Sequence, residues 1–243
     1  MKIIIVPAQG FGDWIIVNPI VRILSKKYDE VGLVYSSYSI KFLKYMFSDL
    51  QNVKFEVECF SGIPNINHIK SQYESSNCVV INLITPGKYN DENVYELNLD
   101  ELNKPFNRCI YEMSGFDWDK DCNEYYIPID ENESKLHHQS LNLPLKYIFL
   151  HESSYPSIDR NYILDKTIPI FIPHQIENVF LYKYTIENAE EIHVVDSGFY
   201  NFADKLDLKT DKYFMHKTRT RSFTSTYLDP LLNKSWKEIE YLS

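Results

Sequence analysis

Two glycine-containing turns hold residues whose types and spacing could do chemistry. The first, Gly10 to Asp13 (GFGD), follows the apolar run from Lys2 to Pro7 and precedes apolar residues at helical spacing. This order predicts a buried strand, a tight turn and a helix. Gly10 and Gly12 would let the backbone turn sharply and leave room for a ligand, which the first N–H groups of the helix would face.

Asp13, the last residue of this turn, has two interpretations. Its carboxylate could cap the helix by accepting an N–H of the first helical turn. Alternatively, it lies at the carboxyl end of the first strand, where open α/β sheets bind their ligands, and could act as a general base. The residue type alone leaves both interpretations open.

The second turn, Asp196-Ser197-Gly198, follows an apolar strand pattern and again precedes a helical pattern. These residues could serve only as helix caps. They could instead hold a diphosphate, because helix N–H groups and the helix dipole both favour an anion. The nearby basic run, which includes Lys217 and Arg219, could supply cations, although such runs are commonly solvated surface.

A third group of candidate residues follows the strand pattern at 147–151. His151, Glu152, Ser153 and Arg160 would lie at or beyond the carboxyl end of that strand, which is again the ligand side of a parallel sheet. His151 could be a core residue, or it could bind a substrate hydroxyl or phosphate. Nowhere do His, Cys, Asp and Glu residues have metal-site spacing, so no metal is expected.

The bulk composition is that of an ordinary globular protein, with 243 residues, 44% hydrophobic and 24% charged. The net charge of −9 argues against a nucleic-acid partner, because such proteins need a positive surface for the phosphate backbone. No apolar stretch is long enough to span a membrane, and the N-terminal run does not resemble a signal peptide. The four cysteines form no CxxC pair, which fits a cytoplasmic setting.

Strand and helix patterns alternate along the chain, which favours parallel sheets with right-handed crossovers. The expected strands cover residues 2–7, 31–35, 53–59, 78–84, 147–151, 168–172, 192–196 and 212–215. Besides the helix after the first turn, the expected helices cover residues 38–47, 68–73, 105–114, 179–189, 199–206 and 228–242. The polar segment 130–144 is expected to be a linker. The sequence therefore predicts an α/β protein of two Rossmann-like parallel-sheet domains, residues 1–135 and 136–243, facing a cleft.

The two turns, in this order, resemble the two signatures of the heptosyltransferase-like family of GT-B glycosyltransferases. In that family a GxGD turn opens an apolar helix with a proline, a leucine and a basic stretch, and here Pro19, Arg22 and Leu24 follow the turn. The second family signature is an Asp-Thr/Ser-Gly turn that opens a helix containing His-Leu-Ala. The stretch from Val194 to Leu206 (VVDSGFYNFADKL) is similar to it.

The resemblance implies that the acceptor binds the N-terminal domain, the nucleotide sugar binds the C-terminal domain, and a C-terminal helix crosses back. It implies that Asp13 is the catalytic base and that Ser197 and Gly198 contact the donor diphosphate. The partners would be a nucleotide sugar and a glycan or other hydroxyl acceptor, with no further cofactor.

Three features depart from the family pattern. Asn201 stands where the family has a histidine, the chain is shorter than a usual member, and no lysine-bearing donor loop is evident, although Arg160 could substitute. The sequence thus predicts an inverting, metal-independent glycosyltransferase, with a non-catalytic glycan- or nucleotide-binding protein of the same fold as the alternative. A Rossmann-type oxidoreductase fits less well, because Ile15 replaces the third glycine and no acid ends the second strand.

Overall fold

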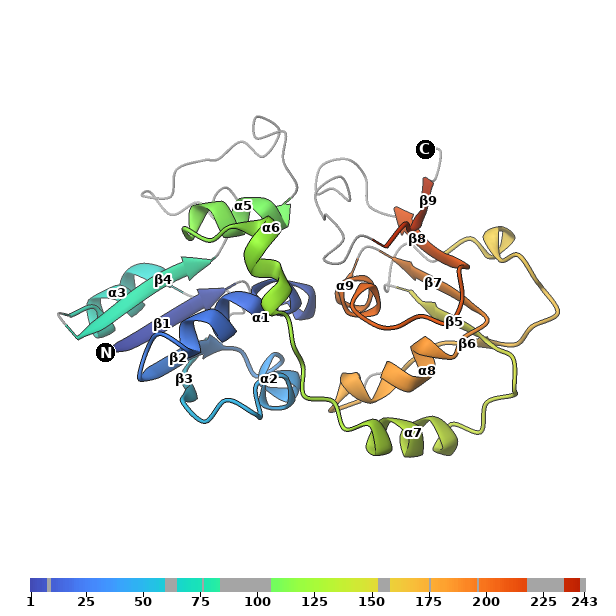
Figure 1. Cartoon of the computed structure of the whole chain (residues 1–243), viewed down its shortest axis with the longest axis horizontal. Coiled ribbons are helices and arrows are strands. Elements are labelled where there is room, and N and C mark those ends of the chain that lie inside the picture. The colour runs from blue at the N-terminus through green and yellow to red at the C-terminus, as the bar shows by residue number, and fades with distance from the viewer. Residues whose placement is uncertain are drawn as a thin grey trace. The chain divides into compact units, whose positions relative to one another are not determined.

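The computed structural model describes residues 1–7, 10–59, 65–75, 77–83, 106–152, 158–174, 176–195, 197–217 and 234–240. They form two compact units, of which the first ends at Pro128 and the second begins at Ile129. Each unit contains one parallel sheet with helices packed against it (Figure 1). Within these ranges, no helix has the length and apolar character that crossing a membrane requires.

The sheet of the first unit has four parallel strands in the order β3-β2-β1-β4. The strands are β1 (Lys2–Pro7), β2 (Glu30–Tyr35), β3 (Val53–Glu58) and β4 (Cys78–Leu83). The helices are α1 (Phe11–Ser25), α2 (Ile40–Met46), α3 (Ile66–Tyr73), α5 (Phe106–Met113) and α6 (Trp118–Asp121), followed by the 3-10 helix η1 (Cys122–Glu124). Each strand lies where its pattern predicts it: β1 and β2 are apolar runs buried almost throughout, whereas β3 follows an alternating pattern and is largely exposed.

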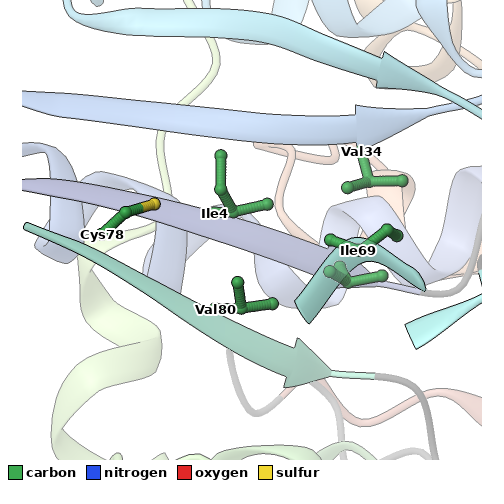
Figure 2. Close-up of a cluster of buried hydrophobic side chains, with 6 residues drawn as sticks. Ile4, Val34, Ile69, Cys78 and Val80 are labelled. Carbon is green, nitrogen blue, oxygen red and sulfur yellow. The ribbon is translucent and has the colours of Figure 1, made fainter. Parts of the chain in front are cut away.

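The core of this unit includes a cluster between the sheet and α3. Ile69 of α3 is buried against Ile4, Val34 and Val80, which come from three neighbouring strands (Figure 2). Cys78 belongs to the same cluster. Burial of these side chains fixes α3 against the sheet.

Arg22 anchors α1 from the buried side of the helix. Its guanidinium donates to both carboxylate oxygens of Asp49, at 2.8 and 3.0 Å, and to the carbonyl of Tyr126 at 2.6 Å. Paired arginine forks of this kind hold a fixed geometry. The orientation of α1, and so of the turn at its start, is therefore set from within the first unit.

The sheet of the second unit has five parallel strands in the order β6-β5-β7-β8-β9. The strands are β5 (Ile148–His151), β6 (Ile170–Phe171), β7 (Glu191–Val195), β8 (Tyr213–Lys217) and β9 (Lys237–Glu240). The helices are α7 (Glu131–Ser140), η2 (Arg160–Tyr162), η3 (Val179–Tyr182), α8 (Lys183–Glu187) and α9 (Gly198–Asp204). The two parallel sheets confirm the predicted α/β fold class.

The segment 130–144, predicted to be a linker, contains helix α7 instead. Asp130 caps the helix by accepting two N–H groups of its first turn. Inside the helix, Ser134 is buried, donates to the carbonyl of Leu181 at 3.0 Å and accepts the N–H of Tyr184 at 2.9 Å. The prediction was wrong because a cap and buried hydrogen bonds, rather than an apolar stripe, hold this helix.

The predicted closing helix at 228–242 is also wrong where the structure describes it. Residues Lys237–Glu240 form β9, which pairs in parallel with β8. The spacing of Trp236 and Ile239 suits a helix, but pairing with β8 satisfies the backbone groups along the edge of that strand. The remaining residues of the predicted helix, 228–233 and 241–242, lie outside the described ranges.

Candidate functional site

Asp13 lies in the first turn of α1, beyond the carboxyl end of β1. Gly10 is the N-cap residue, and its N–H donates to Asp13 Oδ2 at 3.1 Å. The carboxylate therefore makes a capping contact from the third helical position, and the side chain is half-buried. The capping contact also holds the carboxylate at the ligand side of the sheet, so the two interpretations of Asp13 are compatible.

Gly10 is needed for the close approach of this carboxylate rather than for backbone freedom. Its φ of −73° and ψ of 152° suit any residue. A Cβ at Gly10, however, would lie 2.7 Å from Asp13 Oδ2, so a larger residue would displace the carboxylate. Gly12, the other glycine of the turn, is the second residue of α1.

In the second unit, four of the candidate side chains form two contacting pairs near the ends of β5 and β7, His151 with Ser197 and Glu152 with Arg160. We call His151, Glu152, Arg160 and Ser197 the carboxyl-end cluster. His151 is the last residue of β5, and its ring stacks on Phe199 with 4.2 Å between ring centroids. Its Nδ1 lies 3.3 Å from Oγ of Ser197. Since β5 and β7 are neighbours in the sheet, the two strand ends bring these residues together.

His151 is neutral at neutral pH. Burial lowers its pKa to about 4, because an imidazolium ion loses solvation there. Its two ring nitrogens therefore offer one donor and one acceptor, and Nδ1 faces the Ser197 hydroxyl.

Glu152 and Arg160 form the charged part of the cluster. Arg160 Nη2 lies 2.7 Å from Glu152 Oε1, and the side chains are 43% and 19% exposed. Arg160 begins η2, which Asp159 caps by accepting the N–H of Asn161 at 2.9 Å. A partly exposed guanidinium therefore stands beyond the end of β5, where it could bind an anion.

Ser197 and Gly198 open helix α9. Ser197 is the N-cap residue but makes no side-chain capping bond, since its hydroxyl faces His151. Lys217 is the last residue of β8, the next strand in the sheet, and its side chain lies outside the described atoms. Ser153, Asp196 and Arg219 also lie outside the described residues.

Sequence reasoning did not single out a buried chain of three polar side chains, Glu191, His193 and His216. His193 Nε2 lies 2.6 Å from Glu191 Oε1, and His193 Nδ1 lies 2.7 Å from His216 Nε2. All three are fully buried. Burial lowers the pKa of His193, although Glu191 opposes this, and it lowers the pKa of His216 to about 3. The available signal was one histidine within the predicted strand 192–196 and another directly after the predicted strand 212–215.

The adjacent histidines His137 and His138 have structural contacts. The ring of His137 packs against Tyr182, and Nδ1 of His138 lies 3.2 Å from the hydroxyl of Thr185. Across the part of the chain that the structure describes, no three His, Cys, Asp or Glu side chains gather into a potential metal site.

Comparison with solved structures identifies proteins of similar fold. A glycosyl transferase family 9 protein from Veillonella parvula matches with a TM-score of 0.62 and 12% identity, covering 100% of this chain and 87% of that one. The ADP-heptose LPS heptosyltransferase II of E. coli matches with a TM-score of 0.58 and 11% identity, covering 100% and 91%. This chain has a GT-B-like fold. No protein-family model and no curated protein matches the sequence.

The comparisons confirm the predicted resemblance at the level of fold. Each match covers the whole of this chain, so the likeness includes both units. At identities of 11 and 12% it establishes the architecture, while the roles of individual residues have to be argued from their chemistry.

Proposed function

We propose that this protein is an inverting, metal-independent glycosyltransferase that moves a sugar from a nucleotide-sugar donor to a hydroxyl of a glycan or other acceptor. The observation that carries the proposal is the whole-chain fold likeness to glycosyltransferases, combined with polar clusters beyond the strand ends of both sheets. In open α/β sheets, ligands bind at those ends.

The proposed reaction is a single displacement. An acceptor hydroxyl oxygen attacks the anomeric carbon, the bond from that carbon to the donor phosphate oxygen breaks, and the nucleoside diphosphate leaves with the electron pair. Asp13 takes the proton from the attacking hydroxyl. Arg160, with the backbone N–H groups at Ser197 and Gly198, stabilises the charge that develops on the leaving diphosphate.

One observation favours a second candidate, a non-catalytic nucleotide- or glycan-binding protein. Asn201, which stands where the resembled family has a histidine, is buried within α9. A buried amide cannot supply the acid-base chemistry of an imidazole. The two candidates differ in turnover but share a donor site in the second unit.

A thermal-shift panel of nucleoside diphosphates and nucleotide sugars tests the donor site. We expect one diphosphate and its sugar conjugate to raise the melting temperature, equally with and without a chelator, because a ligand that binds only the folded state stabilises it. The corresponding nucleoside monophosphate is the control and should shift it less. A flat panel would contradict the donor site, and binding without transfer to any acceptor would favour the second candidate.

The variant Gly10→Ala tests the placement of the Asp13 carboxylate. The new methyl group would lie where Asp13 Oδ2 now approaches, so we expect transfer to fall by about 10-fold or more, since small misplacements of a reacting group cost rate steeply. The melting temperature should change little, because the backbone angles suit alanine. Steady-state transfer and thermal unfolding measure the two effects. Full activity in Gly10→Ala would show that the position of this carboxylate does not matter.

A further inference from the structure

The ion pair between Glu152 and Arg160 is poorly satisfied on the carboxylate side. Glu152 Oε1 is buried and lies 2.7 Å from Arg160 Nη2, yet no donor among the described residues makes a well-directed hydrogen bond to it. Buried carboxylate oxygens in folded proteins normally accept such bonds, and leaving one without them costs free energy. Among the described residues, charge attraction to Arg160 is therefore the interaction that Oε1 of Glu152 makes.

The pair occupies the end of the sheet where an anionic ligand would bind. Glu152 directly follows β5, so it lies at the carboxyl end of the sheet, beside the end of β7 that leads to α9. A diphosphate bound here would need the N–H groups of Arg160. It would also meet the negative charge of Glu152 at close range, and like charges at that distance repel. The carboxylate and a diphosphate therefore compete for one guanidinium.

We propose that Glu152 is an internal stand-in for the donor diphosphate, neutralising Arg160 in the unliganded protein and leaving it when the diphosphate binds. This inference rests on the proposed function. A diphosphate displaces Glu152 from Arg160 because it carries more negative charge and can accept two parallel hydrogen bonds from the guanidinium group. The return of Glu152 to Arg160 after transfer would help the nucleoside diphosphate to leave, a step that limits many enzymes.

The test measures the affinity of two probes by titration calorimetry at constant pH and ionic strength. One probe is inorganic pyrophosphate, and the other is ADP or UDP, whichever stabilises the protein more. We expect Glu152→Gln to bind both about 3- to 10-fold more tightly, because the competing charge is gone. We expect Arg160→Gln to bind both more weakly. A gain in affinity on removing a contact is an effect that a merely structural role would not produce.

Glu190→Gln is the matched control. Glu190 immediately precedes β7, at the opposite end of the same sheet, where it faces Lys146 and Lys212 at 3.8 and 3.9 Å. This variant removes the same charge from the same unit and should leave both affinities unchanged. A gain in Glu190→Gln equal to that in Glu152→Gln would attribute the effect to net charge and would overturn the proposal.

The remaining outcomes separate this inference from the proposed function. Unchanged or weaker binding of both probes by Glu152→Gln would overturn the stand-in role. Weaker nucleotide binding with unchanged pyrophosphate binding would assign Glu152 to the ribose and overturn it too. Failure of the wild-type protein and of Glu152→Gln to bind either probe would overturn the donor site itself, and this inference with it. If the wild-type protein binds the probes and Glu152→Gln binds them no more tightly, the stand-in role of Glu152 is overturned and the donor site is retained.

Discussion

Replacing Asp13 by asparagine is expected to lower the rate of sugar transfer by about 10²- to 10⁴-fold, the range that a general base contributes. Asparagine keeps a carbonyl oxygen that can accept the N–H of Gly10, so the capping contact at the start of α1 survives. It cannot take the proton of an acceptor hydroxyl. Nucleoside diphosphate binding should be unchanged, because we assign the donor to the second unit.

Steady-state transfer, calorimetric binding of the nucleoside diphosphate and thermal unfolding distinguish the two roles of this residue. Asp117→Asn is a matched control, since Asp117 also caps a helix of the first unit, accepting the N–H of Asp119 at 3.0 Å. It should retain full transfer. If Asp13→Asn turns over like the wild type, Asp13 is a helix cap only, and the base must be sought elsewhere.

The strands were predictable from the sequence because their composition follows directly from burial. Residues Ile3 to Val6 of β1 and Ile192 to Val195 of β7 are buried throughout, and only apolar runs or satisfied polar groups tolerate that environment. The helices and the final strand were less predictable. Helix α7 depends on the cap at Asp130, and β9 depends on pairing with β8, which is a contact between segments far apart in sequence.

The residues of the carboxyl-end cluster were predictable by position, but their pairing was not. Each candidate side chain lies at or beyond the end of a predicted strand, so its place at the ligand end follows from topology. That Glu152 meets Arg160, or that His151 meets Ser197, depends on the path of the connecting segments and on neighbouring strands. Pattern reading gives no register between strands, and register sets such contacts.

The buried histidine chain shows the same limit. His193 lies opposite Phe214 in the register of β7 with β8, and His216 lies opposite Val195. Only this register places His193 Nδ1 2.7 Å from His216 Nε2. The other ring nitrogen of His193 faces Glu191. A one-residue slip would move His216 to the other face of the sheet.

The second unit is expected to lose stability as the pH falls below about 6.5, the ordinary pKa of histidine. Burial lowers the pKa of His151 to about 4 and that of His216 to about 3. The unfolded chain therefore binds protons that the folded unit does not, and the free energy of unfolding falls until the pH reaches the folded pKa values. The two histidines together should remove about 2.7 kcal/mol between pH 7.5 and 5.5.

Urea unfolding at several pH values, followed by hydrogen exchange of the β7 amides, measures this loss in the second unit. Carboxylates contribute little in the window because most titrate below it. His151→Asn should reduce the loss but not abolish it, because the other histidines of the second unit whose pKa values burial lowers, His137, His138, His193 and His216, remain. Ser197→Ala should lose as much free energy of unfolding as the wild type over this pH range, because burial and not Ser197 lowers the pKa of His151. A flat profile in His151→Asn would instead mean that the buried chain already holds a proton in the folded unit, with His193 as an imidazolium ion paired to Glu191 and hydrogen-bonded to a neutral His216.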